Sequence, residues 1–148
     1  FTHNSQISDI MYYIKFIMKN NFFKLIKHLY HFSLVILFIL YLFPGSLVGY
    51  FLYGNLGQQP NIVDNPIGTS INHLFVFIYI SSLGFTDRLR EKKFINSFQF
   101  LFSISILLEI LHYFIPNRAF ESNDLFANNT GVVLAYLFIY LFLKKKFK

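Results

Sequence analysis

The chain has 148 residues, of which 55% are apolar and only 14% are charged, about half the charged share of a soluble domain. Phenylalanine alone contributes 21 residues, the net charge is +6, and the mean hydropathy is +0.48. These values exclude a disordered or collagen-like chain and favour an integral membrane protein over a soluble enzyme. The lack of cysteine excludes disulfides, thiolate metal ligands and thiol nucleophiles.

The N-terminal segment, residues 1–28, is basic and precedes the apolar part of the chain. The chain starts at Phe1, and Met11 and Met18 are both plausible start sites, so we assign no chemistry to residues 1–17 and do not count on them as native sequence. We expect residues 1–28 to be cytoplasmic and residues 29–148 to form one transmembrane domain.

Four apolar stretches follow, and each predicts a membrane-spanning helix. A span needs about 20 residues to cross about 30 Å of hydrocarbon. The first stretch reaches that length only if its helix passes Pro44, which membrane helices tolerate. A soluble bundle would need a polar outer face, which residues 34–43 and 132–143 lack. The sequence therefore predicts an all-α fold, a small polytopic bundle of about four transmembrane helices, with spans near 29–51, 69–86, 94–115 and 125–143.

Lysine and arginine residues predict the orientation of this bundle. In a four-span arrangement, twelve of the 13 cations fall on one side. Four precede the first span, four lie between the second and third spans, and four follow the fourth span. Because cations are enriched in cytoplasmic loops, both termini are expected inside, in the cytoplasmic (inner) membrane.

The third span carries Glu109 and His112 near its outer end. A charge at the centre of the bilayer costs about 2.5–3.5 kcal/mol on insertion scales, so a charged residue in a span is a candidate functional residue. At 100° per residue, Ser105, Glu109 and His112 share one helix face. The structural alternative is a salt bridge or hydrogen bond that orders the bundle.

The fourth span places Asp124, Asn128, Gly131 and Ala135 on one narrow stripe, polar at its outer end and small below. Small residues allow two helix backbones to approach closely, so this stripe is predicted to face the bundle interior. His73 lies in the first turn of the second span, where a lone histidine is more often solvated than a ligand.

Arg118 lies between the third and fourth spans and is the single cation on the outer side of the predicted topology. Its position against the positive-inside trend predicts a specific partner. The candidates are Glu109, Asp124 or an anionic group on a substrate or lipid.

The residues from Leu108 to Gly131 resemble the VanZ-like family, and the resemblance extends over about residues 69–140. The matching residues, in the order in which that family has them, are Glu109, Pro116, Arg118, Asp124, Asn128 and Gly131. His112 stands where the family usually has Gln, and Thr69 and Ser70 stand where it often has an Asp-Lys pair. The resemblance implies a small multi-span membrane domain of a bacterial cell envelope. Some members of that family are linked to resistance against glycopeptide antibiotics such as teicoplanin.

Three functions are compatible with these residues. The first is binding of an envelope component, a lipid-linked precursor or a glycopeptide-type antibiotic at an outer-face site that includes His73, Arg118 and Asn128. The second is a membrane-embedded enzyme acting on a lipid or cell-wall precursor, with Glu109, His112 and Asp124 as catalytic candidates and Glu109 or His112 as general base. The third is a metal site in which His73 and Asp124 complete the Glu-x-x-His pair of Glu109 and His112.

The expected partners are membrane lipids and one of these ligands, without nucleic acid. We assign no metal and no cofactor from the sequence. We also assign no oligomeric state.

Overall fold

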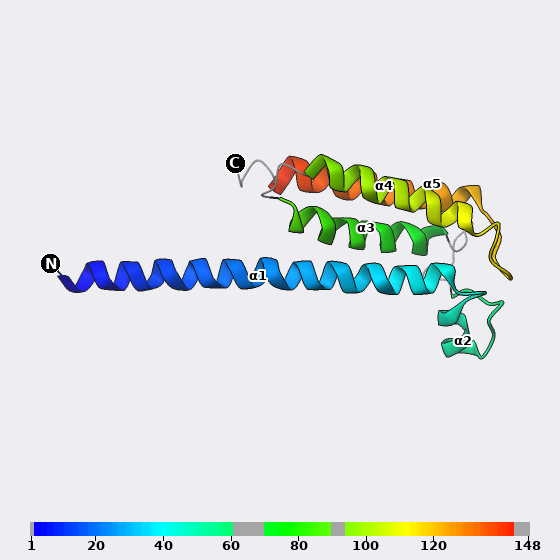
Figure 1. Ribbon diagram of the computed structural model, residues 1–148, viewed down its shortest axis with the longest axis horizontal. Coiled ribbons are helices and arrows are strands. Elements are labelled where there is room, and N and C mark those ends of the chain that lie inside the picture. Colours follow the sequence, from blue (N-terminus) through cyan, green and yellow to red (C-terminus); the bar gives the residue numbers. More distant parts are fainter. Residues whose placement is uncertain (1, 61–69, 90–93, 144–148) are drawn as a thin grey trace.

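The computed structural model describes residues 2–60, 70–89 and 94–143, with side chains described in 20–60, 70–89 and 94–141. The described chain is all-α, which confirms the all-α part of the predicted fold. Figure 1 shows its elements, which are α1 (Thr2–Leu42), α2 (Leu47–Tyr53), α3 (Ser70–Asp87), α4 (Phe94–Leu111), α5 (Ser122–Phe138) and the π-helical turn η1 (Ile139–Leu143).

Four long helices, α1, α3, α4 and α5, lie side by side and alternate in direction along the chain (Figure 1). The strongest packing is between α3 and α5, with α1 against α3 and α4 against α5. Leu42, Ser70, Leu111 and Ser122 therefore lie at one end of the bundle, beside α2, and we call this the α2 end. The core consists of apolar residues such as Phe77, Leu101, Leu108 and Val132, which are fully buried between the helices.

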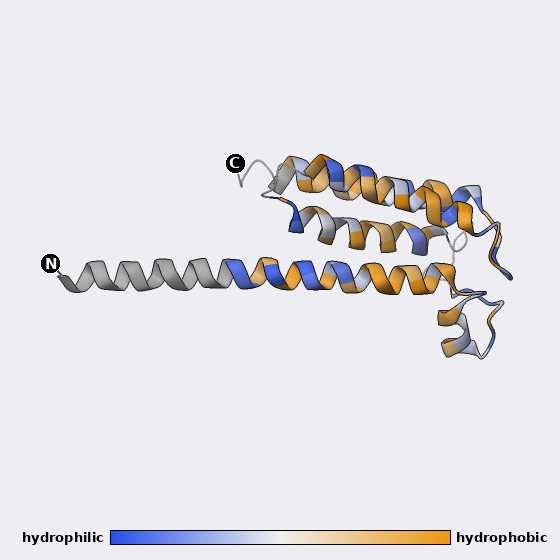
Figure 2. Cartoon of the chain, in the orientation of Figure 1, coloured by the Kyte–Doolittle hydropathy of each residue, from blue (hydrophilic) through white to orange (hydrophobic). Residues whose placement is uncertain are grey.

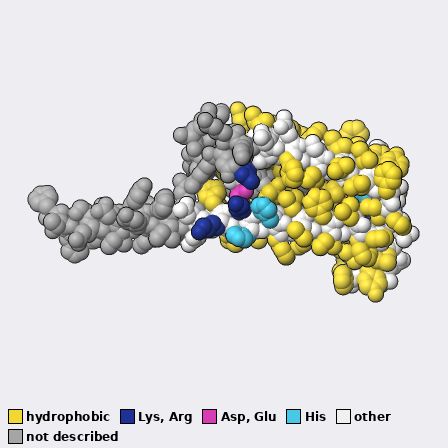
Figure 3. Space-filling model, viewed as in Figure 1, with side chains coloured by type: hydrophobic (Ala, Val, Ile, Leu, Met, Phe, Trp, Pro, Cys, Tyr) yellow, Lys and Arg dark blue, Asp and Glu magenta, His cyan; other side chains and the backbone are white. Residues whose placement is uncertain are grey.

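Three of the described helical segments are long and apolar enough to cross a membrane: Asn20–Leu42, Phe94–Leu111 and Ser122–Leu141. Their outward side chains are also apolar. Phe32, Leu107 and Phe126, for example, are more than half exposed, and Figure 3 shows apolar side chains covering most of one face of the bundle. An apolar core inside an apolar surface indicates a membrane protein. The helix α3 has 18 residues and packs against α1 and α5, but does not meet the same criterion of length and composition.

The prediction that the first span continues to residue 51 is wrong. Helix α1 ends at Leu42, and the chain turns at Pro44 and Gly45, where Gly45 has a φ of 88° that favours glycine. The hydroxyl of Ser46 accepts a hydrogen bond from the backbone N–H of Gly49 at 2.9 Å, so Ser46 caps a separate helix, α2. The span predicted at 29–51 is thus two helices. At its other end, α1 runs unbroken across residue 28, and Figure 2 shows the described part of the helix becoming more hydrophobic towards its end beside α2.

The other predicted spans differ from the structure by a few residues at their ends. Helix α4 ends at Leu111 rather than at 115, because Pro116 disfavours a helical conformation at Ile115 and a series of turns begins at His112. Helix α5 begins at Ser122, before the predicted residue 125, and reaches residue 143 through η1. Helix α3 matches the second predicted span from Ser70 to Asp87, and residue 69 lies outside the described residues.

Part of the charge pattern behind the predicted orientation also lies outside the described residues. This applies to Arg90, Lys92, Lys93 and the C-terminal lysines at 144–146 and 148. The end of α3, the start of α4 and the end of η1, which adjoin those residues in the sequence, lie together at the end of the bundle opposite the α2 end (Figure 1).

Candidate functional site

All six residues selected from the sequence lie at the α2 end of the bundle, on different elements. His73 is in the first turn of α3, Glu109 in the last turn of α4, and Asp124 and Asn128 in the first two turns of α5. His112 follows α4 directly. Arg118 lies in the connection between α4 and α5. Glu109, His112, Asp124 and Asn128 are buried, although all four are polar or charged.

His73 of α3 and Asp124 of α5 lie next to each other in the site. The Nε2 atom of His73 lies 3.4 Å from Oδ2 of Asp124. The other carboxylate oxygen of Asp124, Oδ1, accepts a hydrogen bond of 2.6 Å from the hydroxyl of Ser70. The Asp124 carboxylate is thus held by a residue at the start of α3 and directed at the imidazole one turn further along that helix.

Tyr41, near the end of α1, occupies the centre of the site, although the sequence did not single it out. Its hydroxyl lies 2.6 Å from Nδ1 of His73 and donates to Oδ1 of Asn128 at 3.0 Å. Its ring stacks on the imidazole of His112, with the ring centroids 5.4 Å apart. A buried tyrosine hydroxyl requires a polar partner, but the sequence carries no signal that Tyr41, at the end of an apolar run, is buried.

The carboxylate of Glu109 accepts hydrogen bonds from three directions. Its Oε1 atom accepts from the backbone N–H of Glu121 at 3.1 Å and lies 3.3 Å from Nδ1 of His112. Its Oε2 atom lies 3.5 Å from the amide nitrogen of Asn128. A buried carboxylate with such partners is far less costly than one facing hydrocarbon.

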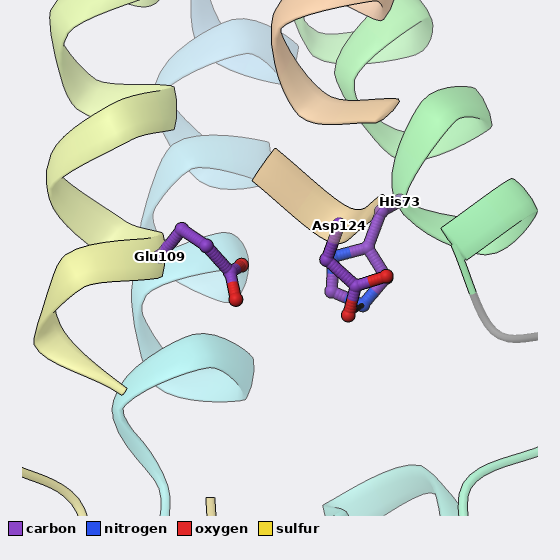
Figure 4. Close-up of side chains that lie close together, drawn as sticks. All are labelled: His73, Glu109 and Asp124. Atoms are coloured by element: carbon purple, nitrogen blue, oxygen red, sulfur yellow. Dashed lines mark ion pairs between the residues drawn. The ribbon is translucent and has the colours of Figure 1, made fainter. Parts of the chain in front are cut away.

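We refer to Tyr41, Ser70, His73, Glu109, His112, Asp124 and Asn128 together as the polar cluster. Figure 4 shows Glu109 reaching from α4 towards His73 and Asp124, which lie together on the opposite side of the interior. His73, Glu109 and Asp124 each offer one ligand atom, and these three atoms lie within 4.8 Å of one another. These three residues could therefore hold a metal ion.

The small residues of α5 explain how the cluster is brought together. A Cβ atom on Gly131 would lie 2.7 Å from the carbonyl oxygen of Leu74 and 2.9 Å from Cβ of Phe77. Helix α3 therefore passes directly over Gly131, and the four residues of the predicted stripe are all buried. This close approach places His73 next to Asp124.

Arg118 bonds to the end of α1 and forms no ion pair with Glu109 or Asp124 among the described residues. Its Nη2 atom donates to the carbonyl oxygen of Leu40 at 2.7 Å, and its Nε atom donates to that of Phe43 at 3.4 Å. The last carbonyls of a helix have no partner within it, so a guanidinium is well placed there. Burial lowers the pKa of Arg118, although an arginine side chain stays charged at any physiological pH.

A pocket of about 120 Å³ opens beside Arg118 at the α2 end, between α1, α2 and α3. Its polar lining includes Arg118, Tyr41, His73 and Asn72, and Val48 of α2 contributes to its apolar wall. We call it the Arg118 pocket. Because Tyr41 and His73 line it and also belong to the polar cluster, the pocket adjoins the buried carboxylates.

Comparisons with protein-family models, with curated proteins and with solved structures find no match for this chain. The resemblance to the VanZ-like family thus rests on the motif residues alone and stays a prediction.

Proposed function

We propose that the chain is a multi-pass protein of the cytoplasmic membrane that binds an anionic group of a cell-envelope component in the Arg118 pocket. The observation that carries the proposal is the guanidinium of Arg118 lining a pocket at one end of an apolar bundle. Arginine suits phosphate and carboxylate because its planar donors match both groups.

Among the Lys and Arg side chains that the structure describes, Arg118 alone lies at the α2 end. The other described Lys and Arg side chains, those of Lys24, Lys27 and Arg88, lie towards the opposite end of the bundle, where Figure 3 shows them gathered. Two of the Arg118 nitrogens bond to carbonyl oxygens of α1, and a guanidinium carries five N–H donors in all. Donors therefore remain for a ligand.

The size of the pocket narrows the choice of ligand. A volume of about 120 Å³ corresponds to about four water molecules, enough for a single phosphate or carboxylate group. A lipid or lipid-linked precursor could place its head group there while its chains stay in the bilayer. A glycopeptide-type antibiotic could insert only one such group. The VanZ-like resemblance of residues 108–131 supports an envelope ligand of this kind.

The proposed topology has four spans, with both termini in the cytoplasm and the α2 end outside. Helix α3 has the length of α4, 18 residues or about 27 Å, and packs between α1 and α5, so α1 and α5 cover its polar residues. The positive-inside rule supports this orientation, which exposes the Arg118 pocket on the extracytoplasmic side.

A second function, acid–base catalysis on the bound head group, is favoured by the pairing of His73 with Asp124. The imidazole lines the pocket, and its two ring nitrogens face Tyr41 and Asp124, so His73 would have to release one of these partners to accept a proton from the head group. Glu109, His112 and Asp124 were the catalytic candidates from the sequence, but none of them lines the pocket and all three are buried. For this alternative, we therefore assign the proton-transfer role to His73.

Blocking the pocket tests the proposed binding. We expect mass spectrometry to detect a lipid with an anionic head group that co-purifies with the native chain. Val48→Trp would fill the pocket without altering a polar residue, and we expect it to reduce the retained lipid at least about tenfold, the equivalent of about 1.4 kcal/mol.

Val35→Trp is the matched control, because Val35 is exposed on α1 and does not line the pocket. Equal lipid retention in the two variants would refute binding at this pocket. Release of a head group by the native chain, abolished in His73→Gln, would establish the catalytic alternative instead.

A further inference from the structure

The positions of the protons around Tyr41 determine whether Nε2 of His73 directs a proton or a lone pair at Asp124. The amide nitrogen of Asn128 faces the Glu109 carboxylate, which only accepts hydrogen bonds, so the amide oxygen of Asn128 faces Tyr41. The single hydroxyl proton of Tyr41 is then used on Asn128. Tyr41 must therefore accept from His73, and the network assigns a proton to Nδ1 of that imidazole.

With its proton on Nδ1, a neutral His73 directs the lone pair of Nε2 at the Asp124 carboxylate. Two lone pairs facing each other repel, so a positively charged species must lie between them. This species is either a proton, as in an imidazolium–carboxylate pair, or a metal ion.

The distance between these two atoms favours a metal ion. A charge-assisted N–H···O hydrogen bond measures about 2.7–2.9 Å, whereas Nε2 of His73 lies 3.4 Å from Oδ2 of Asp124. Two ligands bound at about 2.0–2.1 Å to a tetrahedral zinc ion are about 3.4 Å apart. The observed distance is therefore that expected between two ligands of one metal ion and is longer than a charge-assisted hydrogen bond.

Glu109 supplies a third donor. Its ligand atom lies within 4.8 Å of those of His73 and Asp124, so a side-chain movement of about 1 Å brings all three within the span of one tetrahedral ion. Each ligand is oriented by another residue, as metal ligands typically are. Tyr41 holds His73, Ser70 holds Asp124, and the backbone of Glu121 holds Glu109.

Two further observations fit a cation at this position. Glu109 and Asp124 are buried carboxylates near the end of an apolar bundle, and a divalent ion would neutralise both. His73 also lines the Arg118 pocket, which gives an ion a path from the surface.

We propose that His73, Glu109 and Asp124 form a binding site for a divalent transition-metal ion of the zinc class. Imidazole and carboxylate together suit zinc and its neighbours, whereas Mg²⁺ requires octahedral oxygen ligands. The set is the one considered from the sequence without His112, whose Nδ1 atom lies 3.3 Å from Oε1 of Glu109. The proposal is independent of the ligand of the Arg118 pocket.

Zinc binding to the full-length chain in detergent tests the site. After treatment with a chelator, the protein is titrated with Zn²⁺ and desalted, and the bound metal is measured by elemental mass spectrometry. We expect one Zn²⁺ per chain, a rise in the thermal unfolding temperature with Zn²⁺ but not with equimolar Mg²⁺, and an affinity at least about 100-fold lower in Asp124→Asn.

Two variants complete the design. Ser70→Ala keeps all three ligands and loosens only Asp124, so it tests the site even if Asp124→Asn does not fold, and we expect an affinity about tenfold lower. His31→Gln, which changes an exposed histidine of α1 bonded to the carbonyl of Lys27, should bind Zn²⁺ like the native chain.

Failure of the native chain to bind stoichiometric Zn²⁺ would overturn the proposal and leave a proton between His73 and Asp124. So would unchanged affinity in both Asp124→Asn and Ser70→Ala, or loss of the bound metal in His31→Gln.

Discussion

Tyr41 connects more of the polar cluster than any of the charged residues do. Its hydroxyl contacts residues of α3 and α5, and its ring stacks on His112 beyond the end of α4. A single phenol thus links α1 to the three other long helices. Its removal would leave Nδ1 of His73 and Oδ1 of Asn128 without a partner inside the bundle.

Tyr41→Phe should therefore destabilise the protein. A buried polar group left without a hydrogen bond costs about 1–3 kcal/mol, and the ring itself is retained, so the loss reports the hydroxyl alone. We expect a decrease of this size in the free energy of unfolding, measured by titration with denaturant in detergent micelles.

Tyr50→Phe provides the comparison, because Tyr50 is 52% exposed on α2 and a surface substitution usually changes stability by less than about 0.5 kcal/mol. Equal free energies of unfolding of Tyr41→Phe and Tyr50→Phe would show that the Tyr41 hydroxyl does not contribute to stability.

The residues that could be identified from the sequence are those whose burial in an apolar bundle needs a reason. Glu109 and Asp124 stand out because a charge within or beside a membrane span is costly, and the spacing of Asn128 and Gly131 indicates which face of the helix they share. Tyr41 could not be identified in this way, because a tyrosine near the end of a span is equally at home at the membrane surface. Only the arrangement of the four helices shows that its hydroxyl points inward.

The contact between α3 and α5 is the element-scale feature on which the site depends. Gly131 lies against the backbone of α3, so the two helices are as close as their main chains permit. Alanine in the middle of a helix is normally more favourable than glycine by about 0.5–1 kcal/mol. Here the added methyl group would meet a carbonyl oxygen at 2.7 Å, a distance that real Cβ atoms essentially never show. The steric clash therefore outweighs the helix preference, and alanine at this position lowers the stability.

Gly131→Ala is accordingly expected to destabilise the bundle by about 1–3 kcal/mol, the usual cost of overpacking. It should also lower the Zn²⁺ affinity, because α3 would move away from α5 and His73 from Asp124. Gly57→Ala serves as the control, since a Cβ there meets nothing closer than 3.4 Å. If Gly131→Ala raised the unfolding free energy as a free helical position would, close packing of α3 on α5 would be disproved.

Helix ends were the part of the fold that the sequence predicted least well. The stretch around Pro44 allowed either a kinked helix or two helices, since membrane helices tolerate proline. Gly45 in a left-handed conformation and the cap of Ser46 produce two helices in the structure. The turn is also held by the N–H of Ser46, which donates at 2.7 Å to the carbonyl of Leu56 in the segment after α2. A tertiary contact of this kind leaves little trace in local sequence.

At the scale of the whole molecule, the proposed orientation places the α2 end outside and the opposite end in the cytoplasm. The chain contains no cysteine, so single cysteines can be introduced without a background of native thiols. We expect Gly57→Cys, after α2, to react with a membrane-impermeant maleimide on intact cells. Lys24→Cys, in α1 on the opposite side, should react only after the cells are opened.

Labelling of Lys24→Cys but not of Gly57→Cys on intact cells would invert the topology. Labelling of both would show that the two positions are on the same side of the membrane, which four antiparallel spans do not permit.

The polar cluster also affects when the helices assemble during synthesis of the chain. Tyr41 and Asn128 are hydrogen-bonded, yet 87 positions separate them in the chain, and Asn128 belongs to α5, which follows the three other long helices. Until α5 is made, Tyr41 and Glu109 lack Asn128, and His73 lacks Asp124. Insertion of α5 supplies Asn128 and Asp124 together, so the helices already in the bilayer become a stable unit only after α5 has joined them.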